Sequence, residues 1–266
     1  MNKRLAFIGG GNIAQAILSG LVPTFEDPRT IIVADPSEEQ GLQCKALGAT
    51  WTQDNAAAVA GADVVLLCVK PQLMETVVSA LNGQLAGKLI ISVAAGITAG
   101  QLSTWCGLDN VIRSMPNTPA LVGQGMLGLY AAPSVSDADR ALADELLSTV
   151  GVTRWFEDEH DLDAVTAVSG SGPAYFFYLM EAMIDSAQSL GLSAEAAQEL
   201  VTQTALGAAA MANQQSASPA ALRAQVTSPN GTTHAACEQL RAGGFEGLVD
   251  RALRAARDRS IELSAP

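Results

Sequence analysis

The chain has 266 residues, of which 27 are Asp or Glu and 15 are Lys or Arg, and its formal net charge is −12. This length suffices for two ordinary domains, each with a core of its own. The acidic balance repels polyphosphate, so it argues against nucleic acid and against an anionic membrane as partners. A phosphate-bearing ligand would therefore have to be held by local groups.

The chain starts with MNKRLAF, in which two basic residues lead directly into an apolar strand, without the long apolar region and cleavage site of a signal peptide. We therefore expect an untargeted, cytoplasmic protein. The four cysteines lack C-x-x-C spacing, and the two histidines are His160 and His234. We expect neither a disulfide framework nor a metal site, and we expect reduced thiols that act as small apolar side chains.

The first elements of the chain are a strand, a glycine turn, a helix and a second strand that ends on an acid. The sequence LAFIGGGNIAQAILSGL begins at Leu5, and TIIVADP places Asp35 at the end of the second strand. In a dinucleotide-binding unit Gly9 permits the tight turn, Gly11 lets backbone amides approach a pyrophosphate, and Ala14 keeps the helix close to the sheet. The phosphates would lie at the helix N-terminus, where unpaired N–H groups favour negative charge. The alternative is a purely structural glycine turn.

The first half then continues to alternate strands and helices. A polar helix is expected around Ser37 to Leu47, and apolar strands follow over Asp63 to Pro71 and Lys88 to Gly96. Asn110 to Val122 begins as a further strand, which the prolines at 116 and 119 must end. Continuous apolar strands are typical of parallel sheets that are buried on both faces, and the helices between them imply right-handed crossovers. We therefore predict a doubly wound Rossmann sheet.

The second half changes character near Glu157 and shows no convincing strand. Two segments contain no charged residue, one between Asp163 and Glu181 and one between Glu199 and Arg223. They are poor membrane spans, because Ser, Gly, Pro, Gln and Asn interrupt them. A helix without a polar face must be buried on nearly all sides, and a small helical domain can hardly enclose two such helices alone. We therefore predict a helical subunit interface.

Three further segments place polar groups where a ligand could meet them. Lys70 follows a buried strand at its carboxyl end, the edge at which open α/β sheets bind ligands, and it either reaches a cofactor or is a solvated strand-end lysine. Met115 to Pro119 puts an amide and a hydroxyl between two prolines, with a plain loop as the alternative. Ser228 to Thr233 opens a helix, so its backbone amides and hydroxyls form a second candidate anion site.

The order and spacing of six motifs resemble those of the pyrroline-5-carboxylate reductase family over essentially the whole chain. These motifs are FIGGGNIAQAI from Phe7, CVKPQ from Cys68, SVAAGI from Ser92, RSMPNTPALV from Arg113, DAVTAVSGSGPAYFF from Asp163 and VTSPNGTTHAA from Val226. Two positions depart from the family pattern, since Asn230 stands where Gly is frequent and Cys237 where an aliphatic residue is usual. Neither departure removes a group that the chemistry needs.

The resemblance implies reduction of the cyclic imine (S)-1-pyrroline-5-carboxylate to L-proline, the final step of proline biosynthesis, with NADPH as cofactor and NADH as a second option. It implies a Rossmann domain over residues 1–158 and an all-helical dimerisation and substrate-binding domain over residues 159–266, in a homodimer or a higher oligomer of dimers. Carried over by motif, the cofactor-binding residues are Ile8, Gly9, Gly10, Gly11, Asn12, Ile13, Asn55, Val69, Lys70, Pro71, Ala94, Ala95 and Gly96. The substrate-binding residues are Val226, Ser228, Thr232 and Thr233.

The expected chemistry asks little of the side chains, because the cofactor carries the hydride and the protein supplies orientation. No residue of the turn from Ser228 to Thr233 is a His, Lys or Cys that could act as a base. We therefore assign the substrate carboxylate to hydroxyls and amides of this turn. The ring nitrogen is assigned to the hydroxyl of Thr233, the catalytic candidate, with water as the proton source. The alternative for Thr233 is a helix cap.

Asp35 bears on the choice of cofactor. Its carboxylate could bind the adenosine ribose of NADH and would repel a 2′-phosphate, which makes it a further cofactor-binding candidate. Ser37 and the neighbouring amides could still accommodate the phosphate. We therefore expect both cofactors to work, with NADPH preferred on the resemblance alone.

Two other classes share parts of this pattern. A β-hydroxyacid-type or other imine dehydrogenase usually has a Lys or Asp proton donor in its helical domain, and the corresponding segment here, SGSGPAY, has neither. A non-catalytic dinucleotide sensor would keep the glycine turn without needing SPNGTT.

Overall fold

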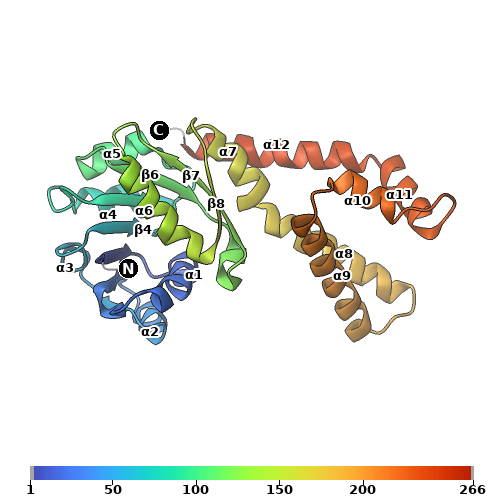
Figure 1. Cartoon of the computed structure of the whole chain (residues 1–266), viewed down its shortest axis with the longest axis horizontal. Helices are drawn as coiled ribbons and strands as arrows, with labels where there is room; N and C mark the ends of the chain where they lie inside the picture. The colour runs from blue at the N-terminus through green and yellow to red at the C-terminus, as the bar shows by residue number, and fades with distance from the viewer. Residues whose placement is uncertain (1–2, 265–266) are drawn as a thin grey trace. The chain divides into compact units, whose positions relative to one another are not determined.

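The computed structural model describes residues 3–264 of the chain. They form two compact units, one with the residues up to Pro173 together with those from Ala255 onward, the other with Ala174–Arg254. The first unit is an α/β domain and the second is helical (Figure 1). Two helices, α8 (Gly172–Ser189) and α12 (Phe245–Ser264), have residues in both units. The domain boundary expected after residue 158 stays a prediction.

The α/β unit is built on an eight-stranded sheet with the order β3-β2-β1-β4-β5-β6-β7-β8. The strand order reverses between β1 and β4, which is the doubly wound arrangement predicted from the sequence. Three central strands, β1, β4 and β5, are buried along their whole length, as their continuous apolar runs require. The strands are β1 (Leu5–Ile8), β2 (Ile31–Ala34), β3 (Thr50–Thr52), β4 (Val64–Leu67), β5 (Leu89–Ser92), β6 (Val111–Met115), β7 (Gly125–Ala131) and β8 (Gly151–Trp155).

Both edges of this sheet contain strands that the sequence pattern does not predict. At one edge β3 pairs in parallel with β2, and at the other edge β7 and β8 follow β6. β7 runs antiparallel to β6, while β8 is parallel to β7. The sheet is therefore parallel from β3 to β6, and the antiparallel pairing of β7 with β6 is an addition to the predicted doubly wound sheet.

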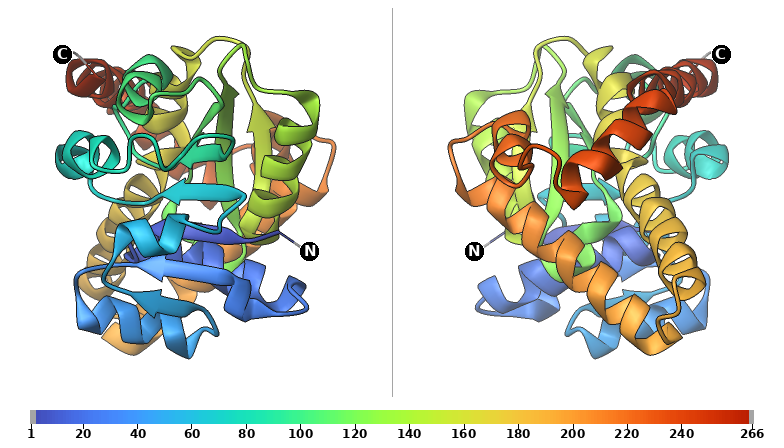
Figure 2. Two further views of the ribbon diagram at one scale, coloured as in Figure 1. Left: turned by 90° about the vertical axis from the view of Figure 1, so that its left-hand side faces the viewer. Right: turned by 90° about the vertical axis from the view of Figure 1, so that its right-hand side faces the viewer.

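Helices cover both faces of the sheet, with α4 and α5 packed against each other on one face (Figure 2). Local capping fixes where several of them begin. The predicted polar helix is α2, and the Ser37 hydroxyl accepts a hydrogen bond from its Gln40 N–H. Helix α5 has a full capping box between Thr98 and Gln101. The helices are α1 (Asn12–Leu21), α2 (Glu38–Ala46), α3 (Asn55–Val59), α4 (Pro71–Ser79), α5 (Ala99–Cys106), α6 (Asp137–Leu147) and α7 (Asp161–Val165).

The unit Ala174–Arg254 contains no strand among its residues, as the sequence predicts. Between the ends of α8 and α12 it holds α9 (Ala194–Gln214), α10 (Pro219–Gln225) and α11 (Thr232–Ala242). The uncharged stretches expose large apolar side chains within this single chain, among them Tyr178 at 74 % and Leu206 at 64 %. Such surfaces are typical of protein interfaces. Within residues 3–264, no helix is both long and apolar enough to cross a membrane.

Candidate cofactor and substrate sites

The glycine turn after β1 lies where the strand order of the sheet reverses. Gly9 has a φ of +100°, and a Cβ at this position would lie 2.8 Å from the carbonyl carbon and the carbonyl oxygen of Cys68, which follows β4. Only glycine allows the ends of the two strands to approach this closely. Gly9 therefore has the steric role expected from the sequence.

Gly11 has the opposite surroundings. It is the N-cap of α1 with a φ of −72°, and a Cβ built on it would meet no atom within 4 Å. No side chain among the described residues caps this helix end, so the first N–H groups of α1 have no side-chain acceptor. An open cradle at unpaired amides fits a pyrophosphate group.

Side chains from neighbouring elements hold Gly10 between these two residues. Its N–H donates to Asp35 Oδ2 at 2.7 Å, and its carbonyl accepts from Gln15 Nε2 at 2.8 Å. Cys44 Sγ lies 3.6 Å from the same carbonyl, and burial raises the pKa of this thiol to about 11, so it is protonated at neutral pH. The turn is therefore fixed by the protein itself, without a ligand.

Asp35 binds backbone groups with both carboxylate oxygens. Oδ2 accepts from Gly10 N, and Oδ1 accepts from Ser37 N at 2.8 Å. Each oxygen keeps a second lone pair, so the carboxylate can still accept from a ribose hydroxyl. The residues that follow, at positions 36–39, are Pro, Ser, Glu and Glu, which bring no positive charge. The sequence pattern does not predict the bond that ties the end of β2 to the glycine turn.

The other predicted cofactor residues lie at the same edge of the sheet. Ile8 ends β1, Asn55 opens the helix after β3, and Lys70 is the exposed N-cap of α4 in the short connection from β4. The segment Ala94–Gly96 follows β5, and Gly96 is buried with a φ of +72°. The structure therefore brings all the predicted cofactor residues to the carboxyl ends of β1 to β5 or to the first turn of the helices that follow.

The loop from Met115 to Pro119 has a structural role at Asn117. This side chain is 8 % exposed, its Oδ1 accepts from Met126 N at 2.9 Å, and its Nδ2 donates to the Ser169 carbonyl at 3.0 Å. Ser169 belongs to a π-helical turn, Thr166–Gly170, that leads into α8. Both polar atoms of the amide are used within the fold, which favours the loop interpretation for Asn117.

The predicted substrate residues lie together in the helical unit. Val226 is the C-cap of α10, and Gly231 is the N-cap of α11, whose first two residues are Thr232 and Thr233. No side chain caps α11 among the described residues, and the Ser228, Thr232 and Thr233 hydroxyls have no hydrogen-bond partner there either. Capping therefore does not explain these hydroxyls.

The conformation of Asn230 explains why the turn tolerates Asn at a position where Gly is frequent in the family. It has a φ of +60°, a left-handed conformation that glycine adopts freely. Asn is among the few other residues that adopt it readily. The substitution therefore keeps the backbone of the turn.

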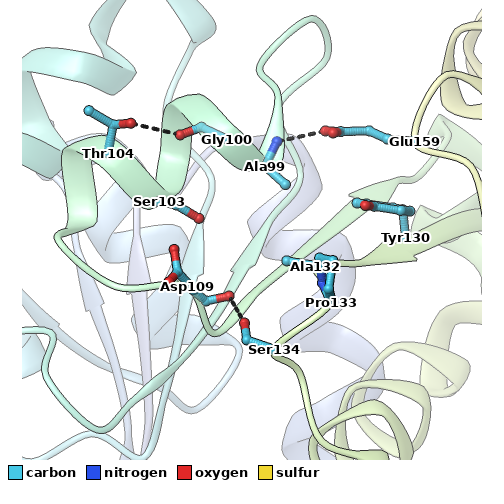
Figure 3. Close-up of a pocket in the computed structure, with 10 residues that line it drawn as sticks. All are labelled: Ala99, Gly100, Ser103, Thr104, Asp109, Tyr130, Ala132, Pro133, Ser134 and Glu159. Carbon is cyan, nitrogen blue, oxygen red and sulfur yellow. Dashed lines mark hydrogen bonds between the residues drawn. The ribbon is translucent and has the colours of Figure 1, made fainter.

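A separate cavity of about 520 Å³ lies beside α5 and β7 (Figure 3). At its rim Glu159 accepts from the Ala99 N–H at 2.6 Å, and the same oxygen pairs with Arg113 Nη1 at 2.8 Å. None of the predicted site residues lines this cavity. Its lining consists of Ala99, Gly100, Ser103, Thr104, Asp109, Tyr130, Ala132, Pro133, Ser134 and Glu159.

Comparisons with known proteins cover the whole chain. Residues 159–263 match a family model described as pyrroline-5-carboxylate reductase dimerisation, and residues 4–96 match one described as NADP oxidoreductase, coenzyme F420-dependent. A pyrroline-5-carboxylate reductase of Pseudomonas aeruginosa is 51 % identical over 98 % of this chain and 97 % of its own length. A pyrroline-5-carboxylate reductase of Pisum sativum is 39 % identical over 98 % of this chain and 96 % of its own.

Solved structures agree with these sequence relatives. The pyrroline-5-carboxylate reductase of Coxiella burnetii is 39 % identical, with a TM-score of 0.93 over 100 % of both chains. The pyrroline carboxylate reductase of Plasmodium falciparum, solved with NADP bound, is 27 % identical, with a TM-score of 0.90 over 99 % of both chains. The motifs, the fold and these relatives together show that the chain belongs to the pyrroline-5-carboxylate reductase family.

Proposed function

We propose that this protein reduces (S)-1-pyrroline-5-carboxylate to L-proline with a nicotinamide cofactor. The observation that carries the proposal is that this chain, a member of the family, contains both a candidate cofactor site and a candidate substrate site. The glycine turn offers an open cradle at Gly11, and the turn before α11 offers three hydroxyls that have no hydrogen-bond partner among residues 3–264. Relatives that span the whole chain are named for this reaction.

The cofactor would lie along the carboxyl ends of β1 to β5. The amides at the start of α1 would hold the pyrophosphate, and Asp35 would meet the adenosine ribose. When bound, the nicotinamide supplies the hydride that reduces the imine carbon. NADPH is the proposed cofactor, supported by the family model for NADP oxidoreductases and by the relative solved with NADP, and we propose that NADH is also accepted.

The substrate would bind at the turn before α11. Hydroxyls and amides from Ser228 to Thr233 would hold its carboxylate, because unpaired N–H groups at a helix start favour an anion. The Thr233 hydroxyl would bind the ring nitrogen and orient the imine, and water would supply the proton that completes the amine. Val226 is 61 % exposed and would add an apolar contact to the ring.

The active form is proposed to be a homodimer or a higher oligomer of dimers. The exposed apolar surfaces of α8 and α9 support this, as does the match of residues 159–263 to a dimerisation model. A second copy of the chain would bury side chains such as Phe177, which is 62 % exposed.

The test is turnover of the purified chain with NADPH and pyrroline-5-carboxylate, beside a panel of other cyclic imines and of hydroxy acids with NADP⁺. We expect oxidation of NADPH with pyrroline-5-carboxylate and formation of proline. Preferential oxidation of a hydroxy acid would instead identify a β-hydroxyacid-type dehydrogenase. Binding of NADPH without turnover of any substrate would identify a dinucleotide sensor.

A further inference from the structure

The last turns of α12 belong to the α/β unit, where they pack against the loop that follows β5. A Cβ built on Gly96 would lie 3.1 Å from Leu263 Cβ and 3.3 Å from the carbonyl carbon and oxygen of Leu263. These separations place the backbone of the loop directly against the helix. Because Gly96 also has a φ of +72°, the contact depends on glycine in two independent ways.

A buried hydrogen bond anchors the same part of α12. Ser260 is 4 % exposed, and its Oγ donates to Asp163 Oδ1 of α7 at 2.7 Å. Just before α7, Glu159 accepts from the N–H of Ala99, the first residue of α5. The loop between β5 and α5 is therefore held at its far end by Glu159 and at Gly96 by Leu263, and α7 is bonded to α12.

The position of this loop in the sheet gives the contact a functional meaning. The glycine turn follows β1, Asp35 lies toward β2, and the loop at Gly96 lies on the opposite side, two strands beyond β1. A dinucleotide that crosses the switch point with its adenosine half toward β2 extends its nicotinamide half toward β4 and β5. The loop held by α12 would therefore face the reactive half of the cofactor.

We propose that Leu263 and Ser260 are positioning residues, through which the end of α12 fixes the β5–α5 loop and so orients the nicotinamide for hydride transfer. This inference rests on the proposed function. Neither residue touches the reacting atoms in this scheme, since Leu263 acts through its contact with Gly96 and Ser260 acts by bonding the same part of α12 to Asp163. Small displacements of a positioning group lower rates strongly, because hydride transfer needs closely aligned partners.

The first test compares Gly96→Ala with Gly87→Ala. Gly87 has a φ of +74°, close to that of Gly96, but a Cβ there would meet no atom within 4 Å. Both variants carry similar backbone strain, and only Gly96→Ala disturbs the contact with Leu263. We expect Gly96→Ala to lower kcat/KM for NADPH about tenfold or more, with a fall in kcat, whereas Gly87→Ala stays near the parent.

The second test compares Ser260→Ala with Ser264→Ala. Among the described residues, the Ser264 hydroxyl bonds only the backbone of its own helix, at Ser260 O. Ser260→Ala should lower kcat, and Ser264→Ala should not. The binding readouts are the fluorescence of bound NADPH, which reports the nicotinamide, and the affinity for adenosine 2′,5′-bisphosphate, which reports the adenosine half. We expect Gly96→Ala and Ser260→Ala to change the former and leave the latter unchanged.

Three results would overturn the inference. They are parent-like kinetics and NADPH fluorescence in both Gly96→Ala and Ser260→Ala, equal losses in the matched controls, and an equal loss of affinity for the adenosine fragment. Failure of the proposed function is distinguishable, because the parent chain would then bind NADPH without turning over pyrroline-5-carboxylate. The two binding readouts need no imine, so they test the positioning in that case as well.

Discussion

Replacing Gly11 by Ala separates the stability of the fold from cofactor binding. Gly11 has φ −72° and ψ −173°, an extended conformation that alanine adopts, and its Cβ would have free space. Reduced freedom of the unfolded chain stabilises by about 0.4–1 kcal/mol, and alanine is a poorer N-cap than glycine by an amount of similar size. We therefore expect the free energy of unfolding to change by less than about 1 kcal/mol.

The same methyl group would occupy the cradle at the start of α1. Loss of a single hydrogen bond to a charged phosphate costs about 1.5–3 kcal/mol, so the Kd for NADPH should rise about ten- to over one hundred-fold. Thermal melting without ligand and fluorescence titration with NADPH measure the two quantities. Gly9→Ala is the matched variant, and it should lose stability as well, because its Cβ would lie 2.8 Å from Cys68 atoms. Unchanged NADPH affinity in a folded Gly11→Ala chain would refute the assignment.

Four further substitutions test the substrate turn, the subunit interface, the cofactor preference and a buried ion pair. Thr233→Val should lower kcat/KM about ten- to over one hundred-fold by removing a hydroxyl that bonds the imine, and unchanged kinetics in a folded variant would contradict that role. Ala209→Glu should place a carboxylate in the interface and abolish assembly and activity together, so a fully active monomer in sedimentation would argue against a shared helical core. Asp35→Asn should raise the ratio of kcat/KM for NADPH over NADH by relieving repulsion of the 2′-phosphate. An unchanged ratio would mean that the Asp35 carboxylate binds backbone groups and does not meet the ribose. Glu159→Ala should destabilise the fold by roughly 3 kcal/mol, because it leaves Arg113, whose side chain is 9 % exposed, without its ion-pair partner. A melting temperature equal to that of the parent would contradict this.

The strands that the sequence predicts are almost wholly buried. β1, β4 and β5 are apolar at nearly every position, so their pattern is visible without any partner. β7 is missed because Gly125 and Gly128 interrupt its pattern. The structure explains Gly128, where a Cβ would lie 2.6 Å from Val165 Cγ1, so a small residue is needed where α7 packs on the strand. β3 is only three residues long and includes Thr50 and Thr52.

The sequence likewise predicts only those parts of the candidate sites that depend on local backbone requirements. The glycine turn and the turn before α11 are visible in the sequence, because local backbone requirements fix their residue types. The bond from Gly10 to Asp35 and the contact of Leu263 with Gly96 are invisible there, since each joins segments that only the tertiary fold brings together. An apolar or polar residue on a terminal helix does not by itself indicate which loop it meets.

Transfer of a label from the cofactor to the product is a direct test of the proposed reaction. The protein would be incubated with pyrroline-5-carboxylate and NADPH that carries deuterium at the transferred position of C4, and the product would be identified by mass spectrometry. We expect L-proline with one deuterium at C5, formed in proportion to the NADPH that is oxidised. Absence of proline, or proline without the label, would contradict it.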